Sequence, residues 1–276
     1  MKKNSLGTVV RDSEQVEESE DFLSIFEFGY TGIKERVYKR DHEEVIKWID
    51  FFNERFRKKK IFETFEGKHP LPDFTKAQVV GSLWYQFSDF MPWFLSQATA
   101  NADSNEVRHY IIQTAFEELG MRDVHEIHPE MFWGVVKASG VSDADRARLG
   151  RNHGIKQVLA FLKTSLLECK TQSEILGMVL GLEMPAQENI ESIFYSVAHS
   201  KEVEAMLTES KFFKLHRQLE EEHIRLAISN FLRFCPSQVE KQEFIKGYDL
   251  GITFWEMFWE NASKTIESEK RNAIDQ

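Results

Sequence analysis

The chain has 276 residues, a net charge of −10, and only 14 glycines and 6 prolines. The acidic balance argues against a nucleic-acid partner, because neutralising phosphates requires a surplus of lysine and arginine on at least one face. Two cysteines are too few for a disulfide framework, and no apolar run reaches the ~20 residues of a membrane span, so we expect a cytoplasmic protein without membrane contact.

The first predicted elements are an extension and two helices. Residues 1–20 are polar and acidic and are expected to form an N-terminal extension. Apolar residues then recur at helical spacing over 41–60 and 75–100, with Pro92 as a kink in the second helix. The basic run "RFRKKK" at 55–60 suits the C-terminal end of the first helix, where cations complement the dipole.

Capping signals mark the next helices. "NADSNE" at 101–106 predicts the start of a helix that ends near Gly120, and Pro129 suits the first turn of a helix over 129–139. Ser142 and Asp145 resemble a capping box. Further helices are expected at about 155–169, 172–198, 202–232 and 237–268.

The chain shows no internal repeat, linker or domain boundary. Residues 263–276 are expected to fray, with 269–276 as a polar tail. The sequence therefore predicts an all-α protein whose residues 21–268 form one helical bundle.

One face of the helix expected at 202–232 carries three titratable residues. His216, Glu220 and His223 fall within about 60° of one another at 100° per residue, so a helix would aim all three in one direction. This pattern is also typical of a solvated helix face, so a metal site requires further ligands.

Glu183 is a candidate because it interrupts the apolar segment that contains Met178, Leu180, Leu182 and Met184. A buried carboxylate without a partner is costly, so it must be neutral, hydrogen-bonded or bound to a cation. An arginine partner, or a place at the edge of the core, is the alternative interpretation.

A helix junction supplies two more candidates. Glu118 lies two residues before Gly120, and His128 precedes Pro129, which disfavours helical geometry at His128. One helix end and one helix start would thus offer a glutamate and a histidine. His125 competes with His128, although an ordinary loop position is the simpler interpretation of His125.

The combined set holds three carboxylates and three imidazoles: Glu118, His128, Glu183, His216, Glu220 and His223. Iron or manganese accepts this mixture better than structural zinc, calcium or magnesium. Six side chains can hold two metals with a bridging carboxylate. Only Glu220 and His223 match the Glu-x-x-His motif of ferritin-like bundles, which counts against that fold.

The order of these residues resembles that of the haem-oxygenase-like di-iron oxidases, which are relatives of thiaminase II, pyrroloquinoline-quinone synthase and CADD-like proteins. The resemblance covers about residues 75–265. It rests on "EELG" at 117–120, "HPEMF" at 128–132, "GLEMPAQENI" at 181–190 and "HRQLEEEH" at 216–223. The family usually has aspartate where this chain has Glu220.

The resemblance implies one bundle of about seven or more α-helices, often dimeric, with two Fe(II) ions or a Mn/Fe pair in its core and O2 as co-substrate. Glu118 and His128 would serve mainly one metal, Glu183 would lie between the metals, and the remaining three residues would complete the second site. The implied reactions are oxidative decarboxylation, desaturation, C–C cleavage or N-oxygenation of an amino-acid-like or fatty-acid-like substrate. An external electron donor is possible.

Two other functions fit the same fold. A cofactor-free enzyme or thiaminase II-like hydrolase is one, but neither Cys169 nor Cys235 lies in a recognisable reactive setting for a nucleophile. An interaction module with a structural metal or none is the other. The aromatic segment 83–94 and Trp133 could line an apolar substrate cavity, although core packing is the simpler interpretation.

Overall fold

A computed structural model describes residues 42–59, 73–121 and 123–274 of the chain, except for the side chains of His42 and of residues 218–223. The chain divides into two compact units, Met1–Glu44 and Val45–Gln276. In the first unit only residues 42–44 are described, so the predicted extension at 1–20 lies outside the described residues.

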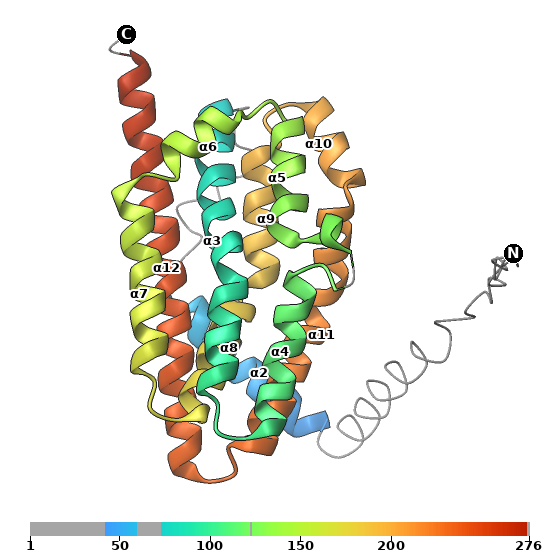
Figure 1. The fold of residues 1–276 in the computed structure, drawn as a ribbon, viewed down its shortest axis with the longest axis vertical. Helices are drawn as coiled ribbons and strands as arrows, with labels where there is room; N and C mark the ends of the chain where they lie inside the picture. Colours follow the sequence, from blue (N-terminus) through green and yellow to red (C-terminus); the bar gives the residue numbers. More distant parts are fainter. Residues whose placement is uncertain (1–41, 60–72, 122, 275–276) are drawn as a thin grey trace, which may run out of the picture. The chain divides into compact units, whose positions relative to one another are not determined.

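Every regular element in the described ranges is helical, which confirms the predicted all-α class (Figure 1). The elements are α2 (His42–Arg57), α3 (Phe74–Asn101), α4 (Asn105–Glu118), the 3-10 helix η1 (Val124–Glu126), α5 (His128–Ala138), α6 (Asp143–Leu149), α7 (His153–Glu168), α8 (Gln172–Glu183), α9 (Ala186–Val197), α10 (Lys201–Glu209), α11 (Lys211–Phe234) and α12 (Gln238–Ile274). No described helix is long and apolar enough to cross a membrane.

The predicted caps are present. Ser104 accepts a hydrogen bond from the Val107 backbone at the start of α4, and Ser142 and Asp145 form a reciprocal capping box at the start of α6. Pro129 lies in the first turn of α5. Because proline needs no backbone donor there, α5 begins at His128 without losing a hydrogen bond.

Two of the predicted long helices are each divided. The helix expected at 172–198 breaks at Met184 and Pro185 into α8 and α9, because proline has no N–H to continue the helix and its ring clashes with the preceding turn. The helix expected at 202–232 breaks at Ser210, whose side chain accepts a hydrogen bond from the Phe213 backbone and caps α11.

The expectation that the C-terminal residues fray was wrong for residues 263–274. Helix α12 continues to Ile274. Lys270 pairs with Asp73 at 2.5 Å, and Arg148 pairs with Glu269 at 2.6 Å. These ion pairs tie the last turns of α12 to residues before α3 and in α6, which a scan of local composition does not reveal.

The basic run at 55–59 lies at the C-terminal end of α2, as predicted, and Arg55, Lys58 and Lys59 have acidic partners. Arg55 pairs with Asp249 of α12, and Lys59 lies 3.2 Å from Glu256 of the same helix. Arg55 and Lys59 therefore form ion pairs within the second unit.

Aromatic residues of α3 belong to the core. Leu83, Trp84, Phe87 and Phe94 are buried, and Trp84 stacks on Trp255 of α12 with ring centroids 5.4 Å apart. The core-packing interpretation of this segment is therefore correct for its aromatic residues Trp84, Phe87 and Phe94.

Helices α8 and α12 make the most extensive contact in the described part of the chain. A Cβ atom on Gly177 would lie 1.9 Å from the Phe244 carbonyl oxygen, and one on Gly247 would lie 1.9 Å from the Glu174 carbonyl oxygen. Only glycine permits such an approach of the two backbones. Helix α8 is thus held directly against α12 up to the turn that carries Glu183.

Candidate metal centre

The junction between α4 and α5 brings Glu118 and His128 together. Helix α4 ends at Glu118, and the chain reverses through Gly120 at φ 78° and Met121 at φ 54°. A Cβ atom on Gly120 would lie 2.4 Å from the Asp123 carbonyl oxygen, so the turn requires glycine. Helix α5 then places His128 Nδ1 3.3 Å from Glu118 Oε2.

Both side chains at this junction are largely shielded from solvent. The exposed fraction is 12% for the His128 side chain and 23% for that of Glu118. By contrast, His125 is exposed on η1, where its backbone N–H donates to Asp123 Oδ1. The structure therefore brings His128, and not His125, against Glu118.

His216 approaches the same junction from α11. Its ring centroid lies 4.9 Å from that of His128 and 4.1 Å from that of Phe212. Its Nδ1 lies 2.8 Å from the Phe212 carbonyl oxygen, one helical turn earlier. Since a carbonyl oxygen only accepts hydrogen bonds, Nδ1 carries the proton, and Nε2 of the neutral ring is left as the nitrogen with a lone pair.

Three predicted ligands from three helices are consequently neighbours: Glu118 of α4, His128 of α5 and His216 of α11. These helices lie next to one another in Figure 1. Among the described side chains, no group of three histidine, cysteine, aspartate or glutamate residues has the spacing to hold a metal ion.

The other three predicted ligands are placed less completely. Glu183 is the last residue of α8 and is partly buried, immediately before the break at Met184 and Pro185. Helix α8 packs against α11, the helix that carries His216. The backbone of α11 is helical through Glu220 and His223, as predicted, while their side chains lie outside the described residues.

Two supporting residues were missed by the sequence analysis. The Phe212 carbonyl orients His216, and the only sequence signal for it is its position four residues earlier on the same helix. Trp255 donates its indole N–H to the Leu182 carbonyl, next to Glu183. No local pattern indicates that second contact, because 73 residues separate its partners.

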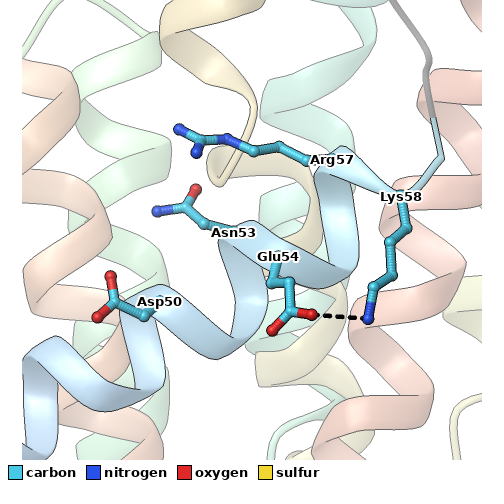
Figure 2. Close-up of a pocket in the computed structure, with 5 residues that line it drawn as sticks. All are labelled: Asp50, Asn53, Glu54, Arg57 and Lys58. Atoms are coloured by element: carbon cyan, nitrogen blue, oxygen red, sulfur yellow. Dashed lines mark ion pairs between the residues drawn. The ribbon is translucent and has the colours of Figure 1, made fainter.

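A hollow on α2 is a separate feature. It is lined by four residues of α2 and by the residue that follows the helix, namely Asp50, Asn53, Glu54, Arg57 and Lys58 (Figure 2). Glu54 and Lys58 form an exposed ion pair at 2.8 Å across one turn. The mixed charge is typical of a solvated helix surface, and none of the predicted metal ligands lines this hollow.

The two cysteines have environments that favour the thiol. Burial, followed by the nearby Glu174 carboxylate, raises the pKa of Cys169 to about 11. Burial also raises the pKa of Cys235 to about 11, although a hydrogen bond with Ser173 opposes that rise. Because the nucleophile is the thiolate, neither side chain is activated for attack at neutral pH.

Comparisons with known proteins concern the segment that carries all six predicted ligands. Residues 83–256 match the sequence model of a family described as iron-containing redox enzymes. No curated protein matches the sequence.

Two crystal structures of a CADD-like protein of unknown function from Nostoc punctiforme, at 2.00 and 1.35 Å resolution, have a similar fold. Their TM-scores are 0.58 and 0.59, and their sequence identities are 14% and 13%. The alignments cover 79% and 81% of this chain, and 98% and 97% of those chains. At such identities the likeness concerns the fold alone.

Proposed function

The chain belongs to the family of iron-containing redox enzymes, and from this premise we propose that it is an O2-dependent non-haem di-iron oxidase. Its substrate would be a small carboxylate or amine, either amino-acid-like or fatty-acid-like. The reaction would be an oxidative decarboxylation, desaturation, C–C cleavage or N-oxygenation. The observation that carries the proposal is the convergence of Glu118, His128 and His216 from three helices.

The chemistry of these side chains fits iron. Carboxylate oxygens and neutral imidazole nitrogens are ligands that Fe(II) accepts in redox enzymes. We propose that Glu118 and His128 hold mainly one iron, and that Glu183 lies between the two irons. His216, Glu220 and His223 would complete the second site. The bound iron would supply one-electron redox chemistry towards O2.

The residues around this centre orient the proposed ligands. The Phe212 carbonyl accepts the His216 Nδ1 proton, so the ring presents Nε2. The carboxylate of Glu118 lies against Nδ1 of His128, which restricts the rotation of that ring. The hydrogen bond from His216 to Phe212 fixes the tautomer and direction of the His216 imidazole before any substrate binds.

Aromatic packing shields the same centre from water. Phe132 of α5 and Phe212 of α11 are buried, and their ring centroids are 5.2 Å apart. The Phe212 ring also covers one face of the His216 ring. Buried aromatic side chains beside the imidazoles strengthen the electrostatic interactions of these rings and limit access by solvent. We further expect an external electron donor and a homodimeric assembly.

The protonated thiols of Cys169 and Cys235 speak against the thiaminase II-like alternative, which needs a reactive cysteine. An interaction module remains the alternative of another class. It differs from the oxidase in a measurable quantity, because such a protein would keep its fold without bound iron and would consume no O2.

The first test is iron analysis of protein produced in iron-supplemented medium, with His128→Ala and His216→Ala as variants. We expect about two iron ions per wild-type chain, and a loss of iron in both variants with unchanged helicity by circular dichroism. O2 consumption is then measured with the Fe(II) protein and candidate amino acids or fatty acids.

The matched control is His125→Ala, three residues from His128 but exposed and away from Glu118. This variant should retain the wild-type iron content. Folded wild-type protein without iron, or equal iron contents in all three variants, would contradict the proposal.

A further inference from the structure

The break after α8 leaves a helix end beside Glu183 that needs hydrogen-bond donors. Pro185 has no N–H, and the last carbonyl groups of a helix have no partner within it. The Met184 N–H donates to the Leu180 carbonyl at 2.8 Å. The Leu182 carbonyl accepts instead from the indole Nε1 of Trp255, at 3.1 Å and in the buried core.

The Trp255 ring is fixed by its own packing. It is 2% exposed and stacks on Trp84, with the two ring planes 15° apart. It also makes an edge contact with Phe87 at a centroid distance of 4.8 Å. Aromatic neighbours on two sides restrict the rotamer of the indole, so its N–H has a set direction.

The backbones of α8 and α12 are in direct contact at Gly181, two residues before Glu183. A Cβ atom on Gly181 would lie 2.4 Å from the Tyr248 carbonyl oxygen, and one on Gly251 would lie 2.8 Å from the Gly181 Cα atom. Packed interiors transmit small displacements because they contain few voids. Helix α12 is therefore a close and rigid reference for the last turn of α8.

We propose that Trp255 is a positioning residue for Glu183. The peptide unit that joins Leu182 to Glu183 is planar, so a hydrogen bond that holds the Leu182 carbonyl also orients the Glu183 backbone. The carboxylate is thereby held at the break in the helix, ready to bind metal. This inference rests on the proposed function, since it gives Glu183 the role of a metal ligand.

Trp259 offers a matched control on the same helix. It lies one turn after Trp255, is 1% exposed, and donates its indole N–H to Asn189 Oδ1 at 2.8 Å. Asn189 belongs to α9, beyond the break. Trp259→Phe thus removes a buried indole hydrogen bond of the same kind without touching the peptide that leads into Glu183.

The experiment is an anaerobic Fe(II) titration of the wild-type chain, Trp255→Phe, Trp259→Phe, Glu183→Ala and the Glu183→Ala/Trp255→Phe double variant. Trp255→Phe should weaken iron affinity about 10-fold, the lower end of the loss seen when the support of a metal ligand is removed. Trp259→Phe should keep wild-type affinity. Thermal unfolding of the metal-free proteins is measured as well. Both tryptophan substitutions should lower the Tm relative to wild type by similar amounts.

The double variant separates positioning from general stability. If Trp255 acts through Glu183, Trp255→Phe adds no loss of iron affinity once Glu183 has been replaced. Trp255→Tyr, which also lacks the indole donor, replaces Trp255→Phe if the latter does not fold.

Equal loss of affinity in Trp255→Phe and Trp259→Phe, or additive losses in the double variant, would overturn the role of Trp255 and leave the iron assignment intact. Unchanged affinity in Glu183→Ala would also overturn this role, and would remove Glu183 from the proposed ligand set. A wild-type chain that binds no iron would overturn the proposed function and, with it, the inference.

Discussion

Glu174 illustrates how one buried charge is accommodated in this bundle. The residue is 5% exposed, yet its carboxylate accepts hydrogen bonds from the Lys170 backbone at 2.7 Å and from the Lys246 side chain. Burial raises the pKa of Glu174, but the bonds from Lys246 and Lys170 outweigh burial and leave that pKa below its ordinary value. The ionised carboxylate therefore stabilises the folded state.

Glu174→Gln should lower the free energy of unfolding by about 2 kcal/mol at pH 7, the range for a hydrogen-bonded charge in a protein interior. Because the folded-state pKa is lower than the unfolded-state pKa, the contribution is present above the unfolded value and is lost as pH falls through the folded value. The stabilities of the wild type and Glu174→Gln should therefore approach each other as the pH falls. Urea unfolding of both proteins from pH 7 down to about pH 3 measures this change.

The control for this experiment is Glu260→Gln. Glu260 pairs with Lys264 one turn away, but both side chains are about two-thirds exposed, at 65% and 70%. Exposed pairs of this kind contribute little to stability. A stability difference for Glu174→Gln that persists unchanged at acid pH would contradict the role of its charge.

At the scale of elements, the contact between α8 and α12 depends on residues without side chains. Gly177→Ala would place a methyl group 1.9 Å from the Phe244 carbonyl oxygen, so one helix backbone must move. We expect a loss of about 2 kcal/mol or more in the free energy of unfolding, which is typical of overpacking a core. Chemical denaturation measures the change.

Gly134→Ala is the matched control for that substitution. Gly134 also lies within a helix, α5, but a Cβ atom there would have no neighbour within 4 Å. Alanine should therefore stabilise the protein by about 0.5–1 kcal/mol, since it restricts the unfolded chain more than glycine does. Equal effects of the two substitutions would show that helix propensity, and not the α8–α12 contact, governs the response.

At the scale of the molecule, the proposed centre joins segments that are far apart in the sequence. Glu118 and His128 lie about a hundred residues before His216 in the chain. Glu183 lies between His128 and His216 in the sequence. A metal held by all of these binds the folded chain and not the unfolded one. Metal binding should then stabilise the whole fold by mass action.

Anaerobic Fe(II) at about 100 times its Kd should raise the free energy of unfolding by about 2.7 kcal/mol for each occupied site, and should raise the Tm by several degrees. His216→Ala should show a smaller rise in Tm. Mg²⁺ at the same concentration is the control, because it prefers all-oxygen ligands. Differential scanning calorimetry provides the measurement, and an identical rise in wild type and His216→Ala would exclude His216 as a ligand.

Local patterns were sufficient for the helical class, for the caps at Ser104 and Ser142, and for helical structure around His216, although not for the break at Ser210. Each of these depends on residues within a few positions of one another, because helix geometry and capping are set by near neighbours. The types of the proposed ligands could be recognised for the same reason. Their identity as ligands stays a prediction.

Contacts between segments that are distant in the sequence could not be predicted from local patterns. The approach of His128 to His216 and the bond from Trp255 to Leu182 appear only in the folded chain. Packing selects these pairs because many distant side chains must fill one interior together, and no single stretch of sequence records which of them meet.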